Sequence, residues 1–305
     1  MEDRRSFLKK TAAGLTFLGL ASAIPIDLFA KEDVVILTIL HTNDMHSRIE
    51  PFPQDAGKYA GFGGMAKRAG LINQIRKQEE YVLLLDAGDI FQGTPYFNYY
   101  GGELEFKLMS EMKYDAATIG NHDFDNGLKG LKDKLPFATF PFLIANYDFS
   151  DTILANQFQP YKTFTRGPLK IGVFGLGIEL KGLVLDSSYE NTKYINPVSV
   201  AREMVQELKQ KECDLIICLS HLGYKYPDSR ISDIELAKQV EGIDLIIGGH
   251  THTFLDNPIP VISPDGNQTL ITQVGWAGIK LGRLDYVFSK GKKKKVSKSS
   301  SLLIN

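Results

Sequence analysis

Short apolar runs alternate with helical patterns along this chain, and that alternation limits the folds open to it. The runs are rich in Val, Ile and Leu and lie at residues 34–40, 81–85, 116–119, 142–145, 215–220 and 243–247. Between them, apolar residues recur three and four positions apart, which predicts helices at 65–78, 104–112, 198–211 and 232–240, the last capped by Ser232. Strands that alternate with helices are typical of a layered α/β fold.

The pattern changes after residue 252. Strand runs at 261–262, 269–274 and 280–288 are separated by Pro264-Asp265-Gly266 and by residues 275–278, which predicts antiparallel hairpins. Residues 296–304 are expected to return as an edge strand guarded by lysines. No internal repeat or long linker interrupts the chain, so residues 31–305 are expected to form one domain.

Residues 1–30 are interpreted as a signal peptide and a short linker. Arg4-Arg5 precedes Phe-Leu-Lys and a mostly apolar stretch at 11–24. Near its end, cleavage after Ala23 would satisfy the small-x-small rule, and Ala30, with Leu28 two residues before it, is the other site considered. The arginine pair resembles a twin-arginine export signal, with an ordinary secretory signal as the alternative. The stretch is too short and too rich in Gly and Ala for a membrane span, so we expect a periplasmic or secreted protein without a stable membrane anchor.

Charge and cysteine content argue against nucleic-acid binding and against a disulfide bond between the two cysteines. Residues 31–289 hold 25 basic and 33 acidic side chains, an acidic balance that does not suit binding of a nucleic acid polymer. The only cysteines are Cys213 and Cys218, too close on an extended segment to pair with each other.

Histidines gather where the predicted strands end. Five of the six histidines fall just after a predicted strand, beside Asp, Asn or Gly. The five motifs are His41-Thr42-Asn43-Asp44-Met45-His46, Asp86-Ala87-Gly88-Asp89, Gly120-Asn121-His122-Asp123-Phe124-Asp125, Ser220-His221-Leu222 and Gly248-Gly249-His250-Thr251-His252. A lone histidine at a strand end is usually structural, but this clustering indicates a shared site.

Topology explains how distant motifs would meet. In open α/β sheets the ligand crevice lies outside the carboxyl ends of the strands, so loops that follow the strands converge there. Imidazoles, carboxylates and an amide gathered at one edge form a typical metal-ligand set.

The motif order Asp-x-His, Gly-Asp, Gly-Asn-His-Asp, His, Gly-Gly-His-x-His resembles the calcineurin-like metallophosphoesterase superfamily. Within it, His-Thr-Asn-Asp-x-His and Gly-Asn-His-Asp-Phe-Asp are similar to the 5'-nucleotidase family. The similarity runs from about residue 36 to 288 in the family's order and spacing. It implies a four-layer αββα sandwich that binds two divalent metal ions, zinc, manganese or similar.

The resemblance also implies a division of the ligands. One ion would be held by Asp44, His46, Asp89 and His252, and the other by Asp89, Asn121, His221 and His250, with Asp89 as the bridge. Some family members carry Gln at the position of His252, which leaves the identity of the metal open.

Two further residues match the family's catalytic pair. His122 would stabilise the transition state or assist the leaving oxygen, and Asp125 would orient its ring, neither being a ligand. His41 and Asp86 are expected to be structural or to support the ligands.

The substrate is expected to be a small phosphate ester, with nucleotides favoured by the resemblance. Family members carry a C-terminal domain that binds the nucleotide, and this sequence stops before it. We therefore keep three accounts: a stand-alone phosphatase, a catalytic subunit completed by a separate protein like that domain, and a metal-binding protein without turnover. Cyclic phosphodiesters and sulfur esters remain alternatives, and the aromatic stretch at 95–100 is a candidate stacking surface.

Overall fold

The computed structural model describes residues 34–289 and 295–305 of the chain. The predicted signal segment at 1–30 lies outside these residues.

Two mixed β-sheets organise the described residues. The first sheet has the strand order β13-β12-β1-β2-β3, the second has the order β10-β11-β9-β8-β6-β5, and β4 pairs with β7 separately. The strands are β1 (Val34–Thr42), β2 (Tyr81–Asp86), β3 (Ala116–Ala117), β4 (Tyr147–Asp148), β5 (Tyr161–Arg166), β6 (Leu169–Leu176), β7 (Lys193–Tyr194), β8 (Leu215–Ser220), β9 (Leu245–Gly248), β10 (Ile259–Ile262), β11 (Gln268–Thr272), β12 (Lys280–Ser289) and β13 (Lys295–Leu303). Strands β1–β3 are mutually parallel, as are β6, β8, β9 and β11.

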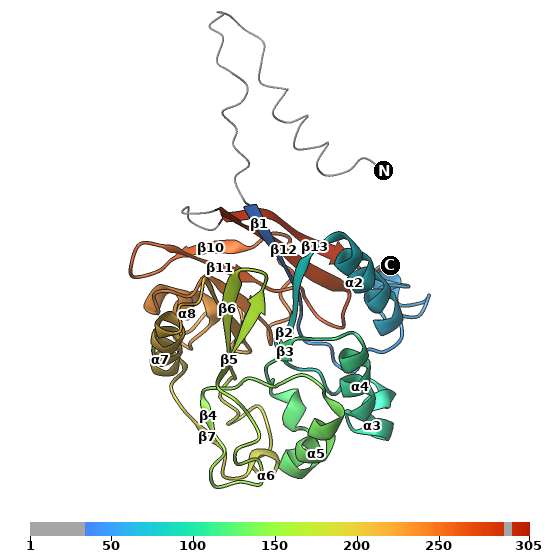
Figure 1. Cartoon of the computed structure of the whole chain (residues 1–305). Helices are drawn as coiled ribbons and strands as arrows, with labels where there is room; N and C mark the ends of the chain where they lie inside the picture. Colours follow the sequence, from blue (N-terminus) through green and yellow to red (C-terminus); the bar gives the residue numbers. More distant parts are fainter. Residues whose placement is uncertain (1–33, 290–294) are drawn as a thin grey trace, which may run out of the picture. The chain divides into compact units, whose positions relative to one another are not determined.

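Helices cover the outer face of each sheet. They are α2 (Met65–Gln78), α3 (Pro95–Tyr100), α4 (Glu103–Glu111), α5 (Gly127–Lys134), α6 (Asp186–Tyr189), α7 (Pro197–Gln210) and α8 (Asp233–Gln239), with short 3₁₀ turns η2 (Gly57–Tyr59), η3 (His122–Phe124) and η4 (Leu135–Phe137). In Figure 1, α7 and α8 lie to the left of the sheets and α2 and α4 lie to the right.

Alternating side chains divide the core into three apolar layers. Leu83 and Leu85 of β2 face the second sheet, whereas Leu84 packs toward the α2 and α4 side. Residues 215, 217 and 219 of β8 likewise face the first sheet, and 216 and 218 pack against α7 and α8. Because successive side chains of a strand point to opposite faces, each buried sheet needs apolar residues throughout. This layering confirms the expected α/β fold of αββα type.

Several predicted elements are confirmed. Helix α2 matches its predicted bounds, and the Ser232 side chain accepts a hydrogen bond from the backbone N–H of Glu235 at the start of α8. Strands β10 and β11 form the hairpin expected around Asp265, and β13 is the expected edge strand beside β12.

Other predictions were wrong. Residues 142–145 make only isolated bridges to residues 117 and 159, so this apolar run is not a strand of either sheet. Residues 275–278 do not turn a hairpin; they carry the chain from β11 in one sheet to β12 in the other. The β5–β6 hairpin was not predicted, although Gly167-Pro168, a dipeptide typical of turns, lies between its strands.

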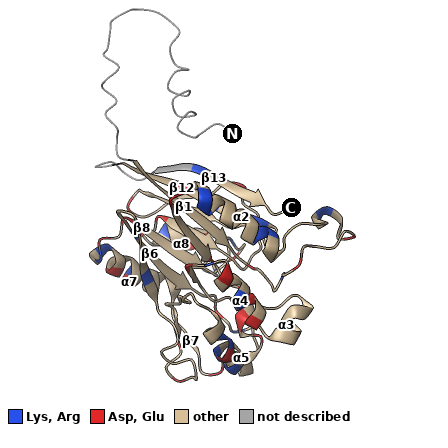
Figure 2. Ribbon diagram, turned by 45° about the vertical axis from the view of Figure 1, so that its right-hand side comes forward, with Lys and Arg blue, Asp and Glu red and all other residues tan. Residues whose placement is uncertain are grey.

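Charges are interspersed on the outer helices. Both α5 and α7 carry basic and acidic residues (Figure 2): Lys129, Lys132, Asp133 and Lys134 on α5, and Arg202, Glu203, Glu207 and Lys209 on α7. Within the described residues, no helix is long and apolar enough to cross a membrane.

Candidate metal centre

The loops after five parallel strands bring the predicted ligands together. Asp44, His46 and His252 form one group and Asp89, His221 and His250 form another, and within each group the ligand atoms lie within 4.8 Å of one another. Asn121 joins the second group, because its Oδ1 lies 2.8 Å from His250 Nδ1. The grouping agrees with the division drawn from the motifs, and the role of each residue as a ligand stays a prediction.

Asp89 lies between the two groups. Its Oδ2 atom is 3.1 Å from Nε2 of His221 and 3.9 Å from Nε2 of His46. Its Oδ1 atom accepts a hydrogen bond from the backbone N–H of His122 at 2.8 Å. One carboxylate oxygen therefore faces both groups, which is the placement that a shared ligand requires.

Five of the clustered residues have left-handed backbone conformations. The φ angles are 51° for Asp44, 48° for His46, 56° for Asp89, 70° for His250 and 51° for His252. This region costs non-glycine residues about 1–2 kcal/mol each. Strain of this kind persists only where surrounding contacts enforce it, and it is typical of functional sites.

Backbone hydrogen bonds between the loops that follow β1 and β2 hold Asp44 and His46 in their left-handed conformations. The N–H of Asp44 donates to the carbonyl of Gly88 at 2.9 Å, and the N–H of His46 donates to the carbonyl of Asp89 at 3.0 Å. The loop after β1 is thereby fixed on the loop after β2, which sets the spacing between the two groups.

Asp123 is a supporting residue that the sequence analysis left without a role. Its buried carboxylate accepts backbone hydrogen bonds from Asp89, Ile90, Phe91 and Gly120 at 2.8–3.1 Å. Burial and the nearby Asp89 raise the pKa of Asp123 to about 7. The side chain fastens the Asp89 loop to the Asn121 loop. Its position beside His122 in a polar motif was the only signal available.

Hydrogen bonds orient two of the imidazole rings. Nδ1 of His221 lies 2.7 Å from the carbonyl oxygen of Ala87, and Nδ1 of His46 lies 3.3 Å from that of Phe91. Each ring thus turns Nε2 toward the centre. Burial lowers the pKa of His46, and it lowers the pKa of His250 to about 4, which favours the neutral imidazole that binds metals.

The donor set fits divalent metal ions. Nε2 of His46 and Nε2 of His252 face each other at 2.9 Å, and Oδ1 of Asp44 lies 3.4 Å from the latter. Among the described residues, buried Nε2 of His221 has no aligned hydrogen bond partner. Converging nitrogen and oxygen donors of this kind suit zinc, manganese and similar ions.

His122 and Asp125 form a pair beside the two groups. His122 Nδ1 lies 2.9 Å from Asp125 Oδ2, and the His122 ring centroid is 5.3 Å from that of His46. The hydrogen bond to Asp125 raises the pKa of His122. The His122 side chain is 37% exposed, so its second nitrogen is accessible to a substrate.

His41 and Asp86 lie below the site rather than in it. His41 is buried with Nε2 3.2 Å from the Thr272 hydroxyl, and burial lowers its pKa to about 3. Asp86 accepts hydrogen bonds from Thr42 Oγ1 at 2.6 Å and from the Gly88 N–H at 2.9 Å. Asp86 therefore supports the turn that presents Asp89.

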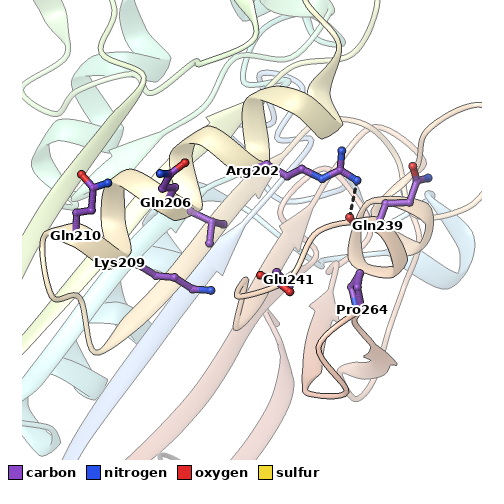
Figure 3. Close-up of a pocket in the computed structure, with 8 residues that line it drawn as sticks. Arg202, Gln206, Lys209, Gln210, Gln239, Glu241 and Pro264 are labelled. Carbon is purple, nitrogen blue, oxygen red and sulfur yellow. Dashed lines mark hydrogen bonds between the residues drawn. The ribbon is translucent and has the colours of Figure 1, made fainter.

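Two other features contain no candidate ligand. A cavity of about 770 Å³ lies between α7 and the end of α8, where Arg202 donates to the carbonyl of Gln239 (Figure 3), and none of the candidate ligands lines it. The aromatic stretch forms helix α3, on which Tyr99 is 85% exposed and Tyr96 stacks with Tyr100 at 6.5 Å.

Known proteins are similar to this chain in sequence and in fold. A model of the calcineurin-like phosphoesterase family matches residues 37–254. Snake venom 5'-nucleotidase from Crotalus adamanteus is 37% identical over 88% of this chain and 48% of its own length, and human 5'-nucleotidase is 33% identical over 88% and 49%. The crystal structure of a 5'-nucleotidase precursor from Thermus thermophilus is 33% identical, with a TM-score of 0.79 over 88% of this chain and 54% of that one.

This chain spans about half the length of these relatives. Residues 37–254, which the family model matches, contain all the clustered residues, whereas strands β10–β13 lie beyond them. The chain therefore belongs to the calcineurin-like phosphoesterase family, among its 5'-nucleotidase-like members.

Proposed function

We propose that this protein is a metal-dependent phosphoester hydrolase that acts on phosphate monoesters, with 5'-nucleotides as the substrate class. The observation that carries the proposal is the pair of ligand groups facing the single carboxylate of Asp89, with His122 alongside. Nucleotides are proposed as the substrate class because the similar proteins are named 5'-nucleotidases.

In the proposed reaction, some side chains would bind the metal ions and others would act on the substrate. Asp44, His46, Asp89 and His252 would hold one divalent ion, and Asp89, Asn121, His221 and His250 the other. Such a pair of ions supplies the Lewis acidity that activates a water and neutralises phosphoryl oxygens. Asp125 fixes the Nδ1–H of His122, so that Nε2 faces the substrate and can stabilise the developing charge or protonate the leaving oxygen.

A substrate panel tests the proposal. The chain without residues 1–30, loaded with zinc or manganese, would be assayed on AMP, a sugar phosphate, a cyclic nucleotide and a sulfur ester. We expect phosphate release from AMP in preference to the others. Release from every monoester at equal rates would overturn the nucleotide assignment while leaving the phosphatase assignment intact.

The same panel addresses a second candidate. The relatives extend well beyond the matched region, which supports a catalytic part whose nucleotide selectivity comes from a further domain or a separate protein. In that case a metal-loaded chain would show weak, unselective turnover that rises when the C-terminal domain of a relative is added.

We further propose that residues 1–30 direct export and that residues 31–305 form the catalytic domain. Expression of the full chain with Arg4-Arg5 replaced by Lys-Lys should leave the protein inside the cell. Unchanged export of this variant would favour the ordinary secretory route.

A further inference from the structure

His252 is held differently from the other imidazoles of the site. The outer nitrogens of His46 and His221 face backbone carbonyls, and their side chains are 9% and 0% exposed. The His252 side chain is 40% exposed, and among the described residues nothing is hydrogen bonded to its Nδ1. Metal-binding histidines usually depend on such a bond to fix the ring.

An aromatic ring occupies the face of His252 instead. The Trp276 ring stacks on it with a centroid distance of 5.8 Å and an interplanar angle of 10°. Parallel rings at this separation are within the range of favourable aromatic contacts. The stack fixes the plane of the His252 imidazole, as a hydrogen bond to a backbone carbonyl does for the rings of His46 and His221.

Trp276 is itself held by a small apolar cluster. Phe52 meets its ring edge to face at 5.7 Å and 77°, and Tyr59 does so at 6.3 Å and 89°. Ala277 and Ile279 complete this cluster. The Trp276 ring is therefore packed against the segment that includes Phe52 and Tyr59.

The backbone beside Trp276 reaches a second residue of the same metal group. The N–H of Ala277 donates to the carbonyl of Asp44 at 2.7 Å, and Ala277 has a left-handed φ of 54°. One short segment between β11 and β12 thus contacts His252 through a ring and Asp44 through a hydrogen bond, and both belong to the first ligand group.

We propose that Trp276 is a positioning residue for the ion held by Asp44, His46 and His252, and that its stack selectively stabilises occupancy of this one site. An imidazole bound to a divalent ion carries partial positive charge, and the face of an indole attracts positive charge. The stack is therefore stronger in the metal-loaded protein than in the metal-free one. This inference rests on the metal centre of the proposed function.

Metal binding to the unaltered chain supplies the first test. Trp276 is the only tryptophan in the sequence, so tryptophan emission reports on this ring alone. The metal-free protein would be titrated with Zn²⁺ while emission and bound metal are measured together. We expect emission to change with one of two binding steps. Emission that stays constant while both ions bind would overturn the proposal.

Variants supply the second test. Trp276→Ala should weaken one ion by about 10–100-fold, the usual effect of removing a group that orients a ligand, and leave the other unchanged. Trp276→Phe, which keeps a stacking ring, should restore most of the affinity. Tyr99→Leu is the control, because it also removes an aromatic ring, but one that is 85% exposed on α3 and outside the cluster around Trp276.

The outcomes distinguish a failure of the role proposed for Trp276 from a failure of the proposed function. Equal loss of both ions in Trp276→Ala, or no loss in it, would overturn the role of Trp276 while the proposed function stands. The same loss in Tyr99→Leu as in Trp276→Ala would show that the effect is not specific to the ring on His252 and would overturn the role of Trp276. Failure of the unaltered chain to bind any ion would overturn the proposed function itself. The titration of the unaltered chain decides the question if Trp276→Ala does not fold.

Discussion

Nε2 of His46 and Nε2 of His252 lie 2.9 Å apart, although 206 positions separate the residues in the sequence. His46 follows β1 in the first sheet, and His252 follows β9 in the second. Two facing imidazole nitrogens can share one proton or bind one cation, and the carboxylates of Asp44 and Asp89 nearby favour the cation. Where the two sheets meet, the negative charge of these carboxylates therefore favours binding of a metal cation between the imidazoles.

Replacement of Asp89 tests the bridging assignment. Asp89→Ala should lower the affinity for both ions, because one carboxylate oxygen faces ligands of both groups. His250→Ala is the matched variant and should weaken mainly the second ion. Metal content after dialysis measures both effects, and an Asp89→Ala protein that keeps two ions would contradict the bridge.

His122 and Asp125 test the separation of chemistry from metal binding. His122→Ala should keep its metal and lose kcat by about 10²–10⁴, the usual contribution of a positioned acid or base. Asp125→Asn should lose less, and adding it to His122→Ala should cost little more, because the orienting group then has no ring to orient. Loss of metal in step with activity would make His122 a ligand instead.

Gly120 tests how tightly the Asp89 and Asn121 loops are packed. A Cβ atom on Gly120 would overlap Asp89 Oδ1, so Gly120→Ala should displace the carboxylate and reduce both metal content and turnover. Gly70→Ala is the control, because nothing lies within 4 Å of its Cβ position in α2 and alanine favours a helix by about 0.5–1 kcal/mol. A fully active Gly120→Ala protein would show that the loops can separate without cost.

His41 tests whether a motif histidine is purely structural. Burial lowers its pKa from 6.5 to about 3, so the unfolded chain takes up a proton that the folded chain does not. Stability is then lost as the pH falls through 6.5, by up to about 1.4 kcal/mol per pH unit. Urea unfolding of the metal-free protein at pH 7 and pH 5 should show a loss about 2 kcal/mol larger than in His41→Gln. Equal losses in the two proteins would place the His41 ring in contact with solvent.

Much of the site was predictable because strand ends carry their own signal. An apolar run followed by His, Asp or Asn marks a side chain at the carboxyl edge of a sheet, and parallel strands place these edges together. Asp44, His221 and His250 were found in this way, and the structure brings them together as expected. The αββα layering followed from the same alternation.

The roles of Asp123 and Trp276 could not be predicted, because they depend on contacts between residues that are far apart in the sequence. Asp123 binds three backbone N–H groups of the Asp89 loop, which the fold brings near it, and Trp276 meets His252 only because the chain crosses between sheets before β12. Residues 142–145 have the composition of a strand but only isolated bridges, because tertiary pairing overrides local propensity.

Metal content and AMP hydrolysis, measured on the same sample of the chain without residues 1–30, test the central claim most directly. The protein would be stripped with a chelator, assayed, and assayed again as zinc or manganese is returned. The two ligand groups predict no phosphate release from the stripped protein and full recovery as two ions bind per chain. Undiminished phosphate release from protein shown to be free of metal would contradict the account.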